Sequence, residues 1–366
     1  MATDYTGAID CDIHPKVPSI DSLRRYMDDY WRETVTVRGI DTFETVAYPN
    51  AAPMTLRADA KADAPVAGGQ PKAQAKVRVD EDAGRLAKTH LDRHGFAHGI
   101  LNCLYAVQMI RDEHMAKAFC RAVNDWMRHE WLDRDPRLRA SMVVPIQNIE
   151  YAVDEVNRCA ADPRFVQILF IALGERPLGK SEFWPIYRAA EKHDLTIGIH
   201  AGSSYHHAVT GSGWPTYWSE DYAAQSLGFH GQVGSLVSEG VFVKFPKLKA
   251  VMIESGVTWL PPYLWRLSKF WRGVRLEVPW VDRPPTEIVR DHIRFTLQPF
   301  DAPDDPDTVR RLIDQLPSPD MLLFSSDFPH WQYDGDAMLP PGIDGALARK
   351  VMIDNPRGAY PRLGSA

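Results

Sequence analysis

Carboxylate and imidazole side chains stand at or near the ends of four short apolar segments of the sequence. They are Asp12 and His14 in the first segment, His200 in the second, Glu254 in the third and Asp327 in the fourth. Burying an unpaired carboxylate is costly, and a divalent cation removes that cost. Aspartate and histidine together are ligands that suit zinc, manganese or iron. If the four segments end at the same place in the fold, the sequence indicates a metal site.

In the first segment, the alternation of side chains along a strand predicts which residues lie on the same face. Side chains alternate between the two faces of a strand, so Asp10, Asp12 and His14 are expected on one face and the apolar residues between them on the other. Asp12 and His14 could instead form a buried hydrogen-bonded pair, and Asp327 could cap the helix that follows it.

Short apolar runs alternate with helical patterns from about residue 80 onward. Strands are expected at residues 7–14, 97–105, 138–144, 165–172, 195–201, 248–254, 293–297 and 321–326. Helices are expected at residues 86–94, 112–133, 149–161, 181–193, 225–239, 257–270, 304–315 and 345–353. This alternation predicts a parallel sheet that is buried on both sides. Eight such units close into a (β/α)8 TIM barrel, an α/β fold whose site lies at the carboxyl ends of the strands.

An open, doubly wound sheet is the alternative, and it usually carries a glycine-rich turn after its first strand. Here Asp12-Ile13-His14-Pro15 occupies that position, so a nucleotide cradle is not supported. We expect residues 1–366 to form a single barrel domain. Residues 35–80 are expected to be a long irregular, exposed insertion after the first strand, because their middle has almost no large apolar side chain.

Composition excludes several classes of protein. The 366 residues contain 42 Lys and Arg against 48 Asp and Glu, so the basic surplus of a nucleic-acid binder is missing. No apolar run approaches the roughly 18 residues of a membrane span, and we recognise no secretion signal. The four cysteines show no CxxC spacing and are expected to be buried, reduced thiols. A cytoplasmic protein with a small-molecule substrate, and with neither nucleic-acid nor membrane partners, is therefore expected.

The chain resembles the amidohydrolase superfamily, in the amidohydrolase-related branch that contains aminocarboxymuconate semialdehyde decarboxylase and the dihydroxybenzoate-type decarboxylases. The matching segments are Asp12-Ile13-His14, residues 196–202, 240–249 and 254–261, the segment 323–330 with Ser326-Asp327-Phe328-Pro329-His330, and Asp354-Asn355-Pro356. The resemblance implies one divalent metal held by Asp12, His14, His200 and Asp327, with zinc expected and manganese or iron as alternatives. A single metal is expected, and a second metal is left open as the alternative.

Two departures from the family pattern matter. The fourth strand has no lysine, so a carbamate-bridged metal pair is in doubt. The decarboxylases of this branch carry histidine at the end of the sixth strand, where this chain has Glu254. Glu254 could be a ligand, a catalytic group or the partner of an arginine.

Further candidates lie past the strand ends. Asp327 is expected to transfer protons, and His230 either faces the site or is an ordinary buried histidine. Arg176 and Gln298 could hold a substrate carboxylate or carbonyl. Trp218 belongs to an aromatic-rich segment, 203–222, which is expected to be a loop that walls the substrate or contacts another subunit.

These features predict a metal-dependent hydrolase or non-oxidative decarboxylase that acts on a small organic acid or amide. The alternative is a metal-dependent oxygenase or hydroxylase on the same scaffold, or a supporting subunit of one, with Asp10, Glu254 and His230 completing a second metal position. A homo-oligomer, such as a dimer, is expected, and a hetero-oligomer with a related subunit is the alternative.

Overall fold

The computed structural model describes residues 6–40, 81–105, 107–330 and 337–364. Most of the expected insertion at 35–80 lies outside the described residues. Its first residues do not fit the expectation of irregular structure, because Val35 to Val37 form the last turn of helix α2 (Asp29–Val37).

Eight parallel strands form one sheet in chain order, as the sequence predicts. They are β1 (Ile9–Ile13), β2 (His98–Leu101), β3 (Leu138–Val143), β4 (Phe165–Leu173), β5 (Thr196–Ser203), β6 (Ala250–Ile253), β7 (Ile293–Thr296) and β8 (Leu322–Leu323). The chain beyond β8 returns to β1 through a parallel bridge between Ile13 and Phe328. The Cys11 amide also donates a hydrogen bond to the Phe324 carbonyl. The sheet is therefore nearly closed, and the predicted (β/α)8 TIM barrel is confirmed.

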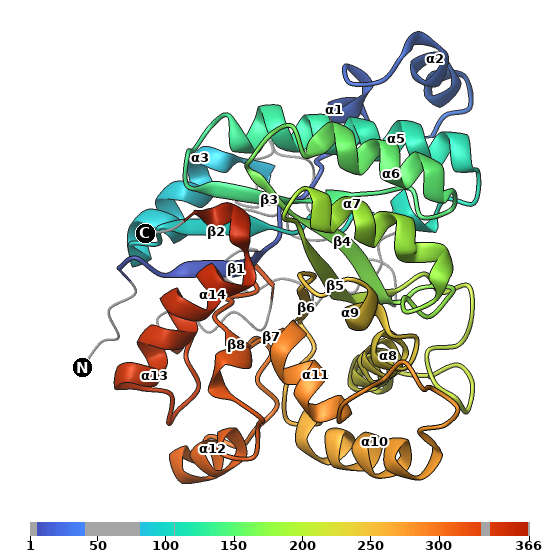
Figure 1. Cartoon of the computed structure of the whole chain (residues 1–366). Coiled ribbons are helices and arrows are strands. Elements are labelled where there is room, and N and C mark those ends of the chain that lie inside the picture. The colour runs from blue at the N-terminus through green and yellow to red at the C-terminus, as the bar shows by residue number, and fades with distance from the viewer. Residues whose placement is uncertain (1–5, 41–80, 106, 331–336, 365–366) are drawn as a thin grey trace.

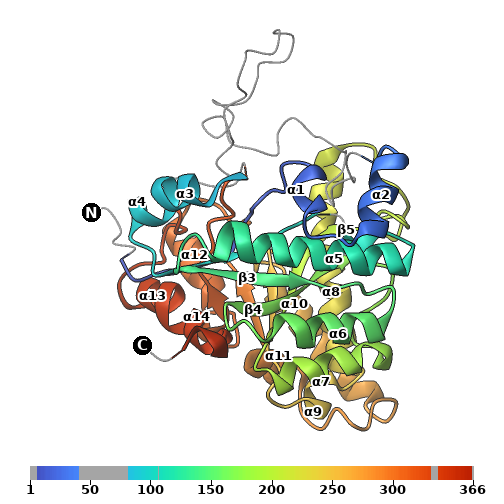
Figure 2. The same cartoon turned by 90° about the horizontal axis from the view of Figure 1, so that it is seen from above.

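Helices surround the strands, with α5, α6 and α7 on one side and α10, α12 and α13 on the opposite side (Figures 1 and 2). The α-helices are α1 (Asp21–Arg24), α2, α3 (Ala83–Leu86), α4 (Asp92–His94), α5 (Glu113–Met127), α6 (Ile149–Cys159), α7 (Trp184–Lys192), α8 (Trp218–Ser238), α9 (Val241–Lys244), α10 (Leu260–Val274), α11 (Pro285–His292), α12 (Pro306–Ile313), α13 (Gly345–Arg349) and α14 (Asn355–Ala359). Shorter turns and π-helical segments are η3 (Ala87–Leu91), η4 (Val107–Met109), η5 (Arg128–Leu132), η6 (Ser181–Phe183), η7 (Pro319–Met321), η9 (Lys350–Asp354) and η10 (Pro361–Leu363). Among the described residues, none of these helices has the length and apolar content needed to cross a bilayer.

Local sequence explains where many of these helices begin and end. Asp112, Asn148 and Asp305 accept hydrogen bonds from backbone amides in the first turns of α5, α6 and α12. Such N-caps satisfy amides that have no partner inside the helix. The helical stretch that precedes β2 ends at Gly95, whose φ of +68° suits glycine.

Several elements differ from the sequence expectation, among them the short helices α1, α2 and α9, which were not predicted. Helix α8 begins at Trp218 rather than at residue 225, so Trp218 and Tyr222 lie on a helix and not in a loop. The polar stretch from Glu220 to Gln225 hid this start, because it lacks apolar periodicity. Helix α11 was not predicted, because its short, charged sequence shows no clear period.

Four buried polar side chains link strands β2, β3 and β4 to the C-terminal segment; we call them the interior network. The Tyr360 hydroxyl donates to Gln167 Oε1 (3.1 Å), and the Gln167 amide donates to Ser141 Oγ (2.7 Å) and to Asn102 Oδ1 (3.2 Å). The Ser141 hydroxyl donates to the same Asn102 oxygen (2.6 Å). Because each group is paired in a water-poor place, the network is expected to be rigid.

Gly198 on β5 gives the Gln167 side chain the room that it occupies. A methyl group at Gly198 would overlap the Gln167 amide. We expect Gly198→Ala to lower the free energy of unfolding by about 1–3 kcal/mol, the usual cost of overpacking. Gly231→Ala is the matched control, because nothing lies within 4 Å of the added methyl on α8. That change should stabilise the helix by about 0.5–1 kcal/mol. Equal urea midpoints for the two variants would contradict the packing described.

Candidate metal centre

Side chains from β1 and β5 meet across the barrel. His14 Nε2 lies 3.2 Å from Asp12 Oδ1, and His200 Nε2 lies 3.5 Å from Asp12 Oδ2. Strands β1 and β5 are not neighbours in the sheet, so these side chains touch through the barrel interior. All three residues are buried, and their potential ligand atoms lie within 4.8 Å of one another.

Asp327, which follows β8, reaches the same place. Its Oδ1 lies 2.9 Å from His14 Nε2, and its backbone amide donates to the Asp12 carbonyl (3.1 Å). Asp327 also belongs to a second group of potential ligands with His14, Glu254 and His330, again within 4.8 Å. The two groups share His14 and together draw on the ends of β1, β5, β6 and β8.

Each of the four residues expected to hold a metal carries a buried polar atom with no hydrogen-bond partner among the described residues. These atoms are Asp12 Oδ2, His14 Nε2, His200 Nε2 and Asp327 Oδ2. A buried acceptor without a partner costs about 1–3 kcal/mol, and more if it is charged. The donor set of two carboxylates and two imidazoles fits a divalent ion such as manganese, iron or zinc. The residues present therefore fit a resident cation.

Backbone carbonyls bind Nδ1 of both histidines and leave Nε2 beside Asp12. The Asn102 carbonyl lies 3.2 Å from His14 Nδ1, and the Ala201 carbonyl lies 2.8 Å from His200 Nδ1. A carbonyl only accepts hydrogen bonds, so each Nδ1 must carry a proton. Burial alone would lower the pKa of His14 and of His200, but Asp12 outweighs burial and raises both, so a bound cation would take the place of a proton on Nε2. The Asn102 side chain also donates to Asp12 Oδ1 (2.9 Å). Such partners orient ligands and tune a metal site.

Two carboxylates are held by strained backbone. Glu254 has a φ of +59° and Asp327 a φ of +57°, in the left-handed region that side-chain-bearing residues rarely adopt. Each such residue costs on the order of 1–3 kcal/mol and persists only where its surroundings hold it. The Glu254 amide donates to Thr296 Oγ1 (3.0 Å). This strain turns both carboxylates at the strand ends, beside His14 and His200.

The three carboxylates differ in how readily they take a proton. Burial would raise the pKa of Asp12, but His14 and His200 outweigh it and hold that pKa well below its usual range. Burial likewise opposes His330 and His14 at Asp327, where the net effect lowers the pKa. At Glu254, burial and then the negative charge of Asp327 raise the pKa to about 8. Asp12 and Asp327 are therefore ionised at neutral pH, whereas Glu254 retains a proton.

Asp10 does not lie with Asp12 and His14, although alternation along the strand predicts all three on one face. Its carboxylate accepts hydrogen bonds from His90 Nε2 (2.7 Å) and from the Ser326 amide (2.9 Å) and hydroxyl (2.5 Å). The register between β1 and β2 shifts between Asp10 and Ile13, so simple alternation fails on this strand. Asp10 lies in neither group of potential ligands and instead ties β1 to the end of β8.

His230 lies on α8 and packs against α10 rather than among the ligands. Its ring is 4.3 Å from the Trp259 ring and 4.8 Å from the Tyr263 ring, between centroids. The Tyr263 hydroxyl donates to the His230 carbonyl (2.7 Å). Burial lowers the pKa of His230, so it is neutral at pH 7. His230 belongs to neither ligand group.

The three substrate-binding candidates differ in their surroundings. Arg176 forms an ion pair with Glu182 and lies over the Phe183 ring, and 43% of its side chain is exposed. The guanidinium of Arg176 is thus paired with Glu182 in the segment that follows β4. Trp218 packs against the Tyr222 ring, 5.3 Å between centroids. Gln298 is buried after β7, where its backbone amide donates to Ser325 Oγ (3.0 Å).

Sequence reasoning missed Asn102 and the role of Tyr222. Asn102 is a polar residue at the end of an otherwise apolar strand segment, and that signal could have identified it. The Tyr222 hydroxyl donates to Glu254 Oε1 (3.2 Å), which links α8 to the end of β6. No local pattern in the sequence predicts such a contact between segments that lie far apart in the chain.

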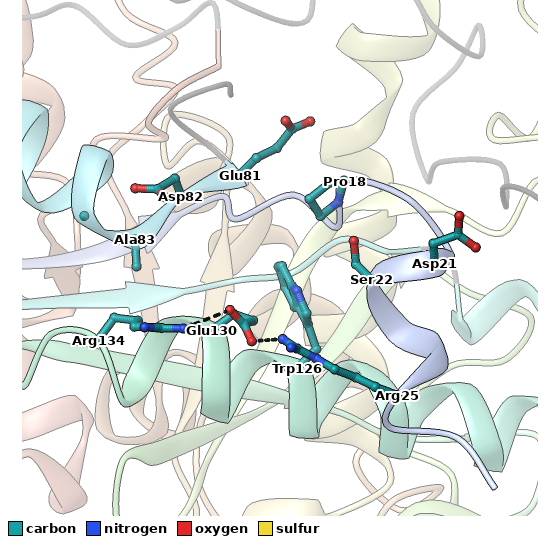
Figure 3. Close-up of a pocket in the computed structure, with 11 residues that line it drawn as sticks. Pro18, Asp21, Ser22, Arg25, Glu81, Asp82, Ala83, Trp126, Glu130 and Arg134 are labelled. Carbon is teal, nitrogen blue, oxygen red and sulfur yellow. Dashed lines mark hydrogen bonds and ion pairs between the residues drawn. The ribbon is translucent and has the colours of Figure 1, made fainter. Parts of the chain in front are cut away.

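A separate hollow of about 730 Å³ lies between α1, the start of α3 and the helical stretch α5–η5 (Figure 3). Its two arginines are already engaged, because Arg25 and Arg134 both pair with Glu130. This pairing leaves little positive charge for an anionic substrate. The hollow therefore does not compete with the metal centre as a catalytic site.

Comparisons with known proteins agree with this geometry. The family model described as Amidohydrolase matches residues 9–362. A gamma-resorcylate decarboxylase from Polaromonas sp. is 26% identical over 193 residues, which is 49% of this chain and 57% of that protein, less than two thirds of its length. A gamma-resorcylate decarboxylase from Rhizobium sp. is 26% identical over 263 residues, covering 67% of this chain and 76% of that protein.

A solved structure shares the fold. It is a dihydroxybenzoic acid decarboxylase from Polaromonas sp. with bound manganese and the inhibitor 2-nitroresorcinol. The TM-score is 0.65 at 18% sequence identity, and the alignment covers 98% of each chain. At this identity the likeness concerns the fold alone.

Removing the cation should destabilise the protein. A ligand present at a hundred times its dissociation constant stabilises the folded state by about 2.7 kcal/mol. We expect chelator treatment to lower the melting temperature by several degrees and added Mn²⁺ to restore it. His14→Ala should melt at one temperature with and without Mn²⁺. A wild-type melting temperature that ignores both chelator and Mn²⁺ would show that no cation is held.

Asn102→Asp should weaken cation binding, because it replaces the amide donor to Asp12 with a second negative oxygen. Changes in such supporting groups typically cost about 10–100-fold in metal affinity. Isothermal titration of chelator-treated protein with Mn²⁺ measures the effect. Asn157→Asp makes the same chemical change on the exposed surface of α6 and should leave the affinity unaltered. Equal affinities for both variants would remove Asn102 from this role.

Proposed function

We propose that this chain, which belongs to the amidohydrolase family, is a metal-dependent non-oxidative decarboxylase of a small hydroxylated aromatic acid. One observation carries the proposal. Four unpartnered, buried ligand atoms converge at the carboxyl ends of the barrel strands, where this fold places catalysis. The reaction class comes from the gamma-resorcylate decarboxylases that the sequence resembles.

Asp12, His14, His200 and Asp327 would hold the cation. Once bound, the cation would act as a Lewis acid that orients the substrate carboxylate and a neighbouring oxygen. We propose manganese rather than the zinc expected from the sequence. The structural relative from Polaromonas sp. contains manganese, and none of the proteins compared above supports zinc.

Decarboxylation breaks the bond between a ring carbon and the carboxylate, and the electron pair left on the carbon takes a proton. Asp327 Oδ2 is buried, has no hydrogen-bond partner among the described residues and is ionised, so it can accept the proton of a substrate hydroxyl and return it to carbon. Glu254, whose pKa is raised by burial and by Asp327, is proposed as a second acid beside the same cluster. Trp218 and Tyr222, at the start of α8, are proposed to wall the aromatic ring. Gln298 is proposed to contact a substrate oxygen.

The remaining assignments are also proposals. The family match over residues 9–362 supports a single barrel domain. Four buried free cysteines favour a reducing compartment such as the cytoplasm. Exposed apolar side chains on and after α10, namely Trp265, Phe270, Leu276 and Trp280, favour a subunit contact, with a homodimer as the simplest form.

Turnover should be detected directly. Chelator-treated protein reloaded with Mn²⁺ should release CO₂ from a panel of mono- and dihydroxybenzoates under argon, without oxygen consumption. Stoichiometric consumption of oxygen would favour an oxygenase instead. Hydrolysis of amides or esters without CO₂ release would place the chain with the hydrolases of the family.

Asp327→Asn should abolish turnover while the fold persists. Loss of a general acid or base typically costs about 10²–10⁴-fold in rate, and loss of a ligand adds to this. Asp304→Asn, the same change in an exposed loop, should retain full activity. Circular dichroism should show equal folding of both variants. An Asp327→Asn protein with the wild-type kcat would exclude Asp327 from proton transfer.

A further inference from the structure

We propose that Gln108 forms a subsite at the mouth of the barrel that accepts a hydrogen bond from a hydroxyl group on the substrate ring. The inference rests on the proposed function for the kind of ring that binds, and it makes the substrate class more specific. It assigns the side-chain oxygen Oε1 of Gln108 as the acceptor. The ring position that this oxygen reaches must then carry a hydrogen-bond donor.

Gln108 lies at the carboxyl ends of the strands, on the side of the barrel formed by β2, β3 and β4. It belongs to the turn η4, which follows β2, and its side-chain amide donates to the carbonyl of Leu169 on β4 (2.5 Å). Leu169 pairs with Val143, the last residue of β3. Two residues further along β4, Ile171 pairs with His200. The side chain therefore crosses the end of β3 near the level of His200, on the rim where this fold places its substrates.

The Leu169 carbonyl determines which way the Gln108 amide faces. A carbonyl accepts hydrogen bonds and cannot donate one, so the NH₂ group must face Leu169 and Oε1 must face away from it. Gln108 is only 9% exposed, and its Oε1 is buried without a hydrogen-bond partner among the described residues. A buried acceptor without a partner is costly, and a donor on a bound ligand would remove that cost.

Gln147, which follows β3, holds the turn that carries Gln108. The Gln147 side-chain amide donates toward three carbonyls of this turn, those of Val107, Gln108 and Ile110. These carbonyls orient the Gln147 amide in turn, and its Oε1 is also buried without a partner among the described residues. Both side chains thus present an acceptor whose direction is set before a ligand binds. A few polar groups placed in this way determine which ligand a pocket selects.

A ring hydroxyl is the donor that suits this acceptor. Gln108 is neutral, so it offers no opposite charge to an anionic group, and a carboxylate or methoxy oxygen has no proton to donate. A phenolic hydroxyl has one, and it agrees with the hydroxylated aromatic acid of the proposed function. With the carboxylate and the neighbouring oxygen at the cation, a further ring hydroxyl remains for Gln108. A site built to bind a hydroxyl discriminates against a ligand that lacks it, because the buried acceptor is then left unpaired.

Ligand binding without turnover tests the subsite. 2-Nitrophenol cannot lose CO₂, and its nitro group stands in for the substrate carboxylate. Full-length, Mn²⁺-loaded protein is titrated calorimetrically with each derivative of 2-nitrophenol that carries one further ring hydroxyl, and with the analogue that has fluorine in its place. Fluorine is close to hydroxyl in size but cannot donate. We expect one hydroxyl derivative to bind about tenfold tighter than its fluorine analogue. Equal affinities in every such pair would overturn the subsite.

A matched pair of variants locates the acceptor. Gln108→Met keeps the length of the side chain and removes the amide oxygen. It should bind the selected hydroxyl derivative about tenfold more weakly than the wild type does, and 2-nitrophenol with unchanged affinity. Gln315→Met, the same change at an exposed residue just after α12, should alter neither affinity. An equal loss for both ligands in Gln108→Met would show a merely structural role and overturn the assignment.

The subsite and the proposed function can fail separately. Release of CO₂ from a hydroxybenzoate, with no discrimination between hydroxyl and fluorine, would overturn the subsite and leave the proposed function intact. Discrimination in favour of one hydroxyl derivative, with no release of CO₂ from any hydroxybenzoate, would overturn the proposed reaction and retain the subsite. Melting curves identify a Gln108→Met protein that fails to fold, and the comparison of hydroxyl with fluorine in the wild type then decides.

Discussion

The concentration of negative charge inside the barrel mouth is the constraint to which the rest of the structure responds. Asp12 and Asp327 are buried, Glu254 lies partly buried beside Asp327, and the groups that meet them among the described residues are mainly imidazoles. Carboxylates in such a place are stable only with a cation, a proton or several hydrogen-bond donors. The orphaned oxygens of Asp12 and Asp327 show that hydrogen bonds do not complete the account. These buried carboxylates therefore require additional positive charge at the mouth of the barrel.

Rigid parts of the protein hold the proposed cation ligands in place. The Asn102 side chain and carbonyl hold Asp12 and His14, and Asn102 is itself held by Ser141 and Gln167. The ligands are therefore fixed through the packed interior of the barrel, and not through surface loops. Supporting contacts of this kind orient the ligands of a metal site and tune the ion that they hold. It also explains why a glycine is required at residue 198, opposite Gln167.

Much of the fold and part of the site could be predicted from the sequence. Eight apolar runs alternate with helical patterns, so the barrel follows from burial of its strands. Asp12, His14, His200, Glu254 and Asp327 could be placed together, because the ends of parallel strands share one rim. His230 and Arg176 could not be placed, because spacing along a helix or loop does not show which neighbour a side chain faces. The register shift in β1, which turns Asp10 toward His90, depends on contacts with β8 and leaves no local signal.

Tyr360 has a consequence for how the protein is made. This residue, near the end of the described chain, completes the chain of hydrogen bonds that begins at Asp12, near its start. During synthesis Asp12 and His14 leave the ribosome before Asp327 and Tyr360. The set of proposed ligands and the hydrogen bonds that support it are therefore incomplete until the segment that follows β8 has been made.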